Sequence, residues 1–127
     1  MANKQYFFAG RVERVVDGDT FDITCDLGFA IYHRIRVRLR GVDTPEVYGP
    51  NACEEGRQVS EYVKSILEGK IVVIQTYKNA PSSFNRWEAD VFVDLLNEDG
   101  SVEKPMTNLA EHLVANQMAR QVLLENK

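Results

Sequence analysis

The run Phe29-Ala30-Ile31-Tyr32-His33-Arg34-Ile35-Arg36-Val37-Arg38-Leu39-Arg40 alternates between two kinds of side chain. One set is apolar and includes a histidine: Phe29, Ile31, His33, Ile35, Val37 and Leu39. The other set is basic: Arg34, Arg36, Arg38 and Arg40. Because successive side chains of a strand point to opposite faces, the pattern predicts a half-buried strand over residues 29–40.

Two more strands are predicted before this one. Residues 7–16 read as a strand, and residues 20–26 alternate cleanly, with Phe21, Ile23 and Cys25 on the apolar side. Turn-forming residues separate the segments at 17–19 and 26–28. Three consecutive strands joined by short turns predict an antiparallel meander.

A helix is predicted next, at about residues 52–68. Asn51 is the expected N-cap, Glu54 answers it three residues later, and Gly69 ends the helix. Its apolar stripe consists of Val59, Tyr62, Val63, Ile66 and Leu67.

The second half of the chain predicts two strands and one helix. Residues 70–77 read as a strand buried on both faces, and 79–85 as a polar loop. A second alternating strand is expected at 87–96, followed by a hairpin signal at 97–100. A second helix is expected at about 107–118, with Leu109, Leu113 and Val114 facing inward.

This order of elements predicts a fold class. Five short strands, with a helix between the third and the fourth, match a five-stranded OB-fold barrel with two helices, an order that other small α+β arrangements share. The protein is therefore expected to be mainly β with helices (α+β), as a single domain over residues 1–127, which suits its length.

Composition narrows the protein class. The 44% hydrophobic and 27% charged content is ordinary for a globular protein. No apolar run reaches the length of a membrane span, and the N-terminus lacks a secretory pattern, so a cytoplasmic monomer is expected. A leader removed before this chain would not be visible in it.

The two cysteines predict no metal centre. Cys25 shares the apolar side of a strand and is expected in the core, whereas Cys53 opens a helix. Two isolated cysteines form neither a zinc pattern nor a disulfide framework.

Two motifs suggest chemistry. They are Asp17-Gly18-Asp19-Thr20 and Arg38-Leu39-Arg40-Gly41-Val42-Asp43-Thr44-Pro45-Glu46. Carboxylate oxygens hold Ca²⁺ or Mg²⁺, and guanidinium groups hold phosphate, so together they suggest metal-assisted chemistry on a phosphodiester. Taken singly, each has an ordinary explanation, because Asp, Gly and Pro also form turns and loops.

The arginine row leaves two interpretations open. Arg34, Arg36 and Arg40 form either a phosphate cradle or a salt-bridged sheet face that binds no substrate. The net charge of −4 weakly disfavours a general nucleic-acid binder. The charge is uneven, however: residues 1–42 carry seven basic and five acidic side chains (net +2), and residues 43–127 carry eight and fourteen (net −6).

The ordered combination of motifs resembles the staphylococcal nuclease (thermonuclease) family. The matching segments are Val15-Val16-Asp17-Gly18-Asp19-Thr20, the run Arg38 to Glu46, Tyr48-Gly49-Pro50, Phe84-Asn85-Arg86 and Asn108-Leu109-Ala110-Glu111-His112-Leu113-Val114. The resemblance implies an OB-fold and Ca²⁺-dependent hydrolysis of DNA and RNA that leaves a 3′-phosphate. Three oxygen ligands with waters would also admit Mg²⁺ or Mn²⁺.

The same resemblance implies roles for individual residues. Asp19, Asp43 and the backbone carbonyl of Thr44 would ligate the metal, with Asp17 in the outer shell. The catalytic residues would be Arg38, Glu46 and Arg86, and the two arginines would also bind the substrate.

The sequence departs from the family at several nucleotide-binding positions. A Lys-Tyr pair is replaced by Ser83-Phe84, and two tyrosines after the second helix are absent from Gln121-Val122-Leu123-Leu124-Glu125. These losses and the acidic net charge predict weak binding that needs low salt. They also keep an alternative open, a non-catalytic OB-fold module that binds nucleic acid or a protein.

Overall fold

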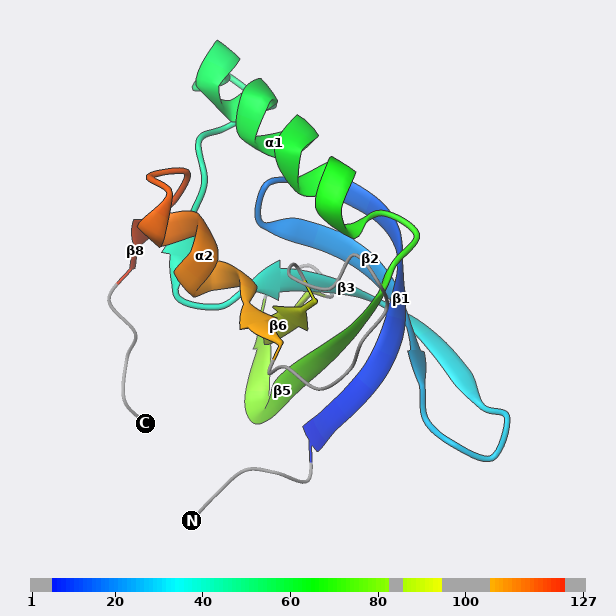
Figure 1. The fold of residues 1–127 in the computed structure, drawn as a ribbon. Helices are drawn as coiled ribbons and strands as arrows, with labels where there is room; N and C mark the ends of the chain where they lie inside the picture. The colour runs from blue at the N-terminus through cyan, green and yellow to red at the C-terminus, as the bar shows by residue number, and fades with distance from the viewer. Residues whose placement is uncertain (1–5, 83–85, 95–105, 123–127) are drawn as a thin grey trace.

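The computed structural model describes residues 6–82, 86–94 and 106–122. Its elements follow one another along the chain as coloured in Figure 1. They are β1 (Phe7–Asp17), β2 (Thr20–Asp26), β3 (Tyr32–Leu39), β4 (Val42–Asp43), α1 (Glu54–Leu67), β5 (Ile71–Ser82), β6 (Arg86–Val93), β7 (Thr107–Asn108), α2 (Leu109–Ala115) and β8 (Arg120–Gln121).

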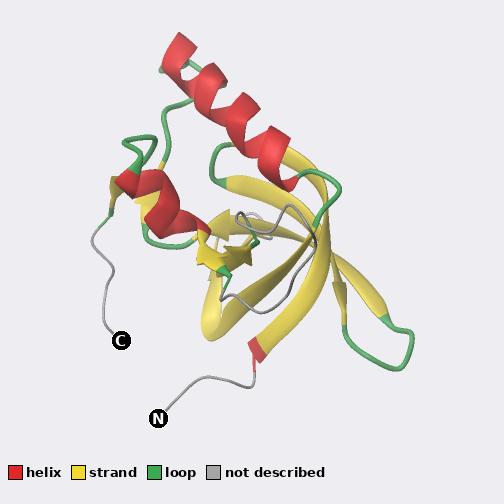
Figure 2. Ribbon diagram, viewed as in Figure 1, coloured by secondary structure: helices red, strands yellow, loops and turns green. Residues whose placement is uncertain are grey.

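Five of these strands close into a barrel. β1 pairs with β2 and with β5, β2 pairs with β3, and β5 pairs with β6, all antiparallel. A parallel pairing of β3 with β6 completes the ring. The predicted fold class is confirmed as a mainly β, OB-fold-like α+β architecture with two helices. α1 lies across one end of the barrel, with α2 beside it (Figure 2).

The inward-facing side chains of the barrel strands form the hydrophobic core. Its fully buried side chains come from all five barrel strands and both helices: Val12, Phe21, Ile23, Val37, Leu39, Val63, Leu67, Val72, Ile74, Ala89, Val91, Leu109 and Leu113. Cys25 is buried among them, as expected. Burying one large apolar side chain stabilises the fold by about 1.5–3 kcal/mol. The alternating apolar residues of the strands therefore stabilise the barrel.

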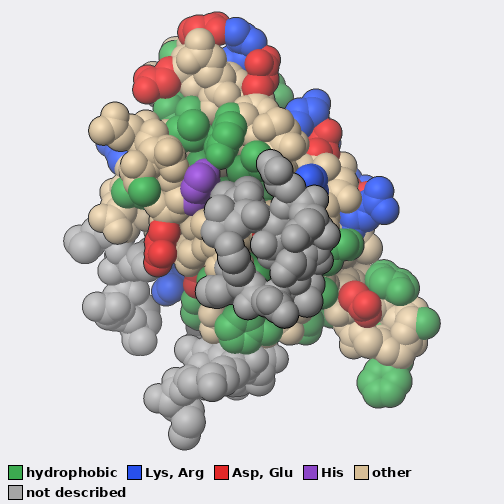
Figure 3. Space-filling view, in the orientation of Figure 1, with side chains coloured by type: hydrophobic (Ala, Val, Ile, Leu, Met, Phe, Trp, Pro, Cys, Tyr) green, Lys and Arg blue, Asp and Glu red, His purple; other side chains and the backbone are tan. Residues whose placement is uncertain are grey.

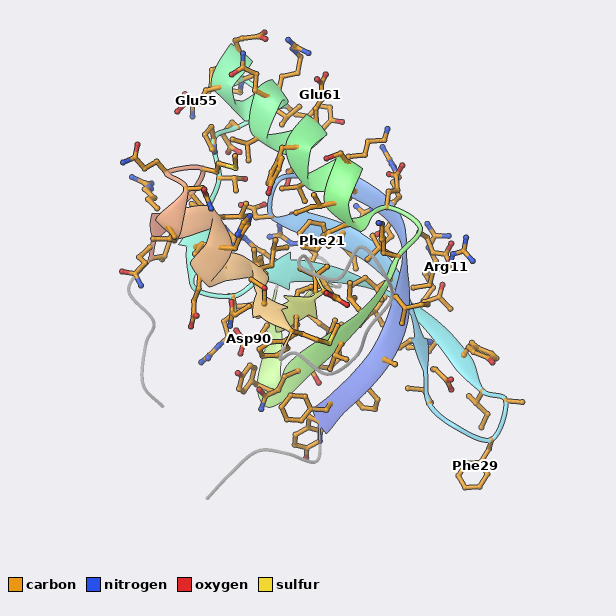
Figure 4. The ribbon with its side chains drawn as sticks, in the orientation of Figure 1. Arg11, Phe21, Phe29, Glu55, Glu61 and Asp90 are labelled. Atoms are coloured by element: carbon orange, nitrogen blue, oxygen red, sulfur yellow. The ribbon has the colours of Figure 1, made fainter. Side chains whose placement is uncertain are left out.

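The start of the third strand was predicted wrongly. β3 begins at Tyr32, because Phe29 and Ala30 adopt positive φ angles of 57° and 60° and belong to the turn of the β2–β3 hairpin. Phe29 was expected to face inward, but it is 97% exposed and stands at the hairpin tip, while Phe21 lies inside the barrel (Figure 4). Ile31 is exposed as well.

The N-cap of the first helix was also predicted wrongly. α1 starts at Glu54, and its cap is Cys53, whose Sγ accepts a hydrogen bond from the N–H of Gly56 at 3.4 Å. The N–H of Cys53 donates to the carbonyl of Glu46 at 3.1 Å, which fixes the helix start. A Cβ on Gly56 would lie 2.0 Å from that carbonyl oxygen, so only glycine fits here.

The later elements differ in extent from the prediction. β5 alternates, with Ile71 exposed and Val72 buried, so it is not buried on both faces. It also runs on through residues expected to form a polar loop. α2 is shorter than expected at both ends, because residues 107–108 pair with β6 and the helix ends at Ala115, just before Gln117 with its positive φ of 61°. The expected hairpin at 97–100 lies outside the described residues. In the part of the chain that is described, no helix combines the length and the apolar character needed to cross a membrane.

Candidate active site

A cleft of about 740 Å³ lies where the β1–β2 turn, the segment after β3, the starts of α1 and β6 and the end of α2 meet. All the residues that the sequence singled out for metal binding or catalysis line it: Asp19, Arg38, Asp43, Thr44, Glu46 and Arg86. Asp17 lines it too. The structure thus brings together side chains that are widely separated in the sequence.

The β1–β2 turn positions the first carboxylates. A register shift between Val15 and Asp17 bends the end of β1, as bulges do where they redirect side chains. The N–H of Asp19 donates to Oδ1 of Asp17, and Oγ1 of Thr20 donates to Oδ1 of Asp19, both at 3.1 Å. The turn therefore holds two carboxylates side by side.

A second contact joins this turn to the loop after β4. The N–H of Thr44 donates to Oδ2 of Asp19 at 3.1 Å, and both residues are buried. Gly18 allows the close approach, because a Cβ at this position would lie 2.7 Å from Oγ1 of Thr44. Asp19 consequently fixes the place of Thr44 in the cleft.

Arg38 lies between two carboxylates. Its Nη1 donates to the carbonyls of Leu39 and Val42, each at 3.0 Å, which holds the guanidinium plane. Its Nη2 contacts the carboxylate of Asp43 and lies 3.6 Å from Oδ2 of Asp19. One cation is therefore shared by the two side chains that were expected to ligate a metal.

Burial and neighbouring charges shift the pKa values of Asp17 and Asp19 in opposite directions. Desolvation, the hydrogen bond with Asp19 and the charge of Asp19 together raise the pKa of Asp17 to about 6. Burial alone would raise the pKa of Asp19, but the hydrogen bond from Asp17, the charge of Arg38 and the Thr44 N–H lower it overall. Because its pKa is the lower of the two, the carboxyl of Asp19 ionises before that of Asp17 as the pH rises.

The donor chemistry of the cleft fits a hard divalent cation. Asp19, Asp43 and Thr44 all line it, and carboxylate and carbonyl oxygens are the ligand type that Ca²⁺ and Mg²⁺ take. Among the described residues, no three His, Cys, Asp or Glu side chains cluster closely enough to hold a metal by themselves. A cation would compete with the Arg38 guanidinium for the Asp43 carboxylate.

Glu46 and Arg86 face the cleft from other elements. The backbone of Glu46 is anchored through its carbonyl to Cys53, and within the described residues its carboxylate has no hydrogen-bond or ion-pair partner. Arg86 opens β6 and pairs in register with Arg36 across the parallel β3–β6 seam. Ser83 and Phe84, where the sequence departs from the family, lie outside the described residues.

Sequence reasoning missed one cation of the cleft. Arg120 of β8 lies opposite Asp43 of β4, and its Nη2 is 3.8 Å from Oδ2 of Asp43. Asn51 and Glu55 also line the cleft. β4 and β8 are two residues long each, too short for any periodic signal, so only the folded chain reveals this pairing.

The arginine row does not act as one unit. Arg34 and Arg36 both pair with Asp22, as the salt-bridged interpretation expected, and these contacts lower the pKa of Asp22. Arg40 instead lies over the ring of Tyr77, with its Cζ 4.1 Å from the ring centroid. Only Arg38 of this strand lines the cleft.

Two arginines line the same cleft as carboxylates that suit a cation. A bound phosphodiester would meet positive charge from Arg38 and Arg86, with the Glu46 carboxylate in the same cleft.

No protein-family model matches the chain, and no curated protein matches it either.

Proposed function

We propose that this protein is a calcium-dependent endonuclease that hydrolyses phosphodiester bonds of DNA, RNA or both. The observation that carries the proposal is the position of Arg38 between Asp19 and Asp43, in a cleft also lined by Glu46 and Arg86. The resemblance of the motifs to the staphylococcal nuclease family supports the same conclusion.

Asp19, Asp43 and the Thr44 carbonyl would hold the cation, with Mg²⁺ or Mn²⁺ as alternatives to Ca²⁺. When bound, the cation supplies positive charge against the phosphoryl oxygens. The adjacent Asp17 supports this assignment, because its carboxylate accepts the N–H of Asp19 and lines the same cleft, so a cation there would face a further negative charge.

The two arginines bind the phosphate and stabilise the transition state. Negative charge grows on the phosphoryl oxygens as water attacks, and preorganised guanidinium groups act on that growing charge. Arg38 is preorganised because two backbone carbonyls hold its Nη1, which leaves Nη2 to exchange the Asp43 carboxylate for phosphate.

Glu46 accepts the proton of the attacking water. A new bond forms between the water oxygen and phosphorus, and the bond from phosphorus to the 5′ oxygen breaks. Arg86 hydrogen-bonds to the departing oxygen, which takes a proton from solvent and leaves as a 5′-hydroxyl, and Glu46 returns its proton to solvent. The product is a 3′-phosphate. The anchored backbone of Glu46 keeps its carboxylate in the cleft, where a general base must lie within reach of the water.

One observation favours a different function. Arg38 already pairs with Asp43, one of the carboxylates expected to ligate the metal, as would suit an OB-fold module that binds nucleic acid or protein and does not cut. A binding module need not respond to Ca²⁺, whereas a Ca²⁺ site in the native state must raise the melting temperature.

Digestion of single-stranded DNA, double-stranded DNA and RNA at low salt separates the two. The protein is incubated with Ca²⁺, with Mg²⁺ or with EDTA, beside a Glu46→Gln variant and an Arg57→Gln control on the exposed side of α1. Cutting that needs the cation, disappears in Glu46→Gln and persists in Arg57→Gln supports the nuclease. A folded protein that cuts none of the three substrates overturns it.

A further inference from the structure

A row of polar side chains leads away from the cleft along β3. Ile35, Val37 and Leu39 pack inward, so the alternate residues point out of the barrel: Tyr32, Arg34, Arg36 and Arg38. Arg38 lines the cleft, and the outward-facing side chains become steadily more exposed to solvent from Arg36 to Tyr32. The Arg36 side chain is 42% exposed, that of Arg34 is 58% exposed, and Tyr32 is 64% exposed.

The two middle arginines are held in place by one carboxylate. Arg36 donates through Nε to Oδ1 of Asp22 at 2.8 Å and through Nη2 to Oδ2 at 3.1 Å. Arg34 donates through Nη2 to the same Oδ2 at 3.4 Å. Two guanidinium groups share one negative charge, so the trio stays positive, and Nη1 of each arginine makes no contact with Asp22.

Adjoining strands extend this positive surface. Arg14 and Arg11 of β1 lie opposite Asp22 and Thr24 of β2, and both arginines are exposed. The acidic residues Glu13 and Asp26 are exposed on the same strands. The row is continuous with the cleft because Arg38, two residues after Arg36 on the same strand, lines it.

The row ends at an apolar hairpin tip. Four large apolar or aromatic side chains are exposed there: Leu27, Phe29, Ile31 and Tyr32. The turn is well bonded: the N–H of Leu27 donates to the carbonyl of Ile31, and the N–H of Ile31 to that of Gly28, both at 2.9 Å. The positive φ of Phe29 is a strained conformation that keeps its ring out in solvent, and such strain is concentrated at functional sites. Hydrophobic side chains gather at this tip (Figure 3).

We propose that a single strand of nucleic acid runs from the cleft along the outer face of β3, with its phosphates on Arg36 and Arg34 and bases stacked on Tyr32 and Phe29. This inference rests on the proposed function, since it extends the substrate of the same cleft. A positively charged track with aromatic side chains is the usual combination in single-strand binding.

The geometry fits an extended strand. Alternate residues of a β-strand lie about 6.6 Å apart, a spacing comparable to that of neighbouring phosphates in an extended single strand. From Arg38 to Tyr32 the track is roughly 20 Å long, so it takes several nucleotides. A duplex keeps its bases stacked inside and cannot offer them to Tyr32 or Phe29, so single strands are the preferred substrate.

Binding in EDTA tests the track without cleavage. Fluorescence anisotropy is measured with labelled oligothymidylates of about two and about twelve nucleotides, because two nucleotides fill the cleft alone whereas twelve fill the cleft and the track. The variants are Arg34→Gln, Tyr32→Ala and Phe29→Ala. The control is Arg57→Gln, an exposed arginine paired with Glu54 and Glu61 on α1.

The expected result depends on length and on salt. Tyr32→Ala weakens binding of the longer oligonucleotide about tenfold and leaves the shorter one unchanged. Arg34→Gln makes the dependence of log Kd on log salt shallower by about 0.7, as for one lost phosphate contact on a single strand. Unchanged affinity and salt slope in all three track variants, or an equal loss in Arg57→Gln, would overturn the track.

Cleavage of the shorter oligonucleotide with Ca²⁺ separates this inference from the proposed function. If the wild type binds the longer strand through the track but cuts neither, the track stands and the nuclease fails. If it cuts both and the track variants cut the longer strand with unchanged KM, the nuclease stands and the track fails.

Discussion

Thr44 donates its backbone N–H to Oδ2 of Asp19 at 3.1 Å, across a sequence separation of 25 residues. This bond connects the β1–β2 turn to the loop that carries Pro45 and Glu46. The bond is shielded from water, because both residues are nearly inaccessible to solvent. The geometry of the candidate metal ligands therefore depends on how closely the two loops approach.

Gly18→Ala should open that approach. The new Cβ would lie 2.7 Å from Oγ1 and 2.9 Å from Cβ of Thr44, so the loops must separate. We expect a loss of about 1–3 kcal/mol in the free energy of unfolding and weaker Ca²⁺ binding, measured by denaturant unfolding and by calorimetric titration. Thr44→Ala in the same chain should restore part of the loss, and strictly additive effects would contradict the contact.

Arg38→Lys should abolish most activity. The guanidinium of Arg38 bonds two carbonyls and reaches Asp43 at once, which a single ammonium cannot do. We expect kcat to fall by about 10²–10³ fold, measured on single-stranded DNA with saturating Ca²⁺. Arg57→Lys, on the solvent side of α1, should keep the wild-type rate, and a comparable rate in Arg38→Lys would remove Arg38 from the mechanism.

Asp17→Asn should stabilise the metal-free protein at neutral pH. The pKa of Asp17 is raised to about 6, so ionising it costs stability from about pH 4 upwards, with the full cost present above about pH 6. After discounting for partial exposure, the gain is on the order of 1–2 kcal/mol near pH 7 and vanishes near pH 4. Thermal melts across this range in EDTA measure it, and a variant that is less stable at every pH would refute the assignment.

Asp22→Asn should have the opposite pH dependence. Arg36 and Arg34 lower the pKa of Asp22, so its carboxylate contributes stability above the ordinary carboxyl pKa and loses it as the pH falls through the lowered value. We expect the variant to be about 1–3 kcal/mol less stable at neutral pH and to converge with the wild type in strong acid. Melting curves from neutral pH into acid follow the difference, and parallel curves would mean that the ion pairs contribute nothing.

Local patterns predicted the parts of the fold that depend on neighbouring residues. β2 has the expected bounds, because alternation and flanking turns define it fully. The expected site residues meet in one cleft because the turn at Gly18 and the loop at Thr44 both follow strand ends on the same side of the barrel.

Tertiary contacts account for what the sequence did not show. Cys53 replaces Asn51 as the helix cap because the chain is anchored to Glu46, which no local pattern predicts. Arg120 reaches Asp43 only through the short β4–β8 pairing. Phe29 looked like a core residue because its alternation was regular, but alternation does not encode the φ angles that turn it outward.

The parallel seam between β3 and β6 has a kinetic consequence. Arg86 stands beside Arg36 only when these strands, far apart in the chain, have paired, so the cleft is incomplete until the barrel has closed. Contacts between distant segments form slowly, because the intervening chain must first lose its conformational freedom. On refolding, the proposed nuclease activity should therefore return only with the slow phase in which the barrel closes. Any unfolding event that separates β3 from β6 should abolish that activity before the helices unfold.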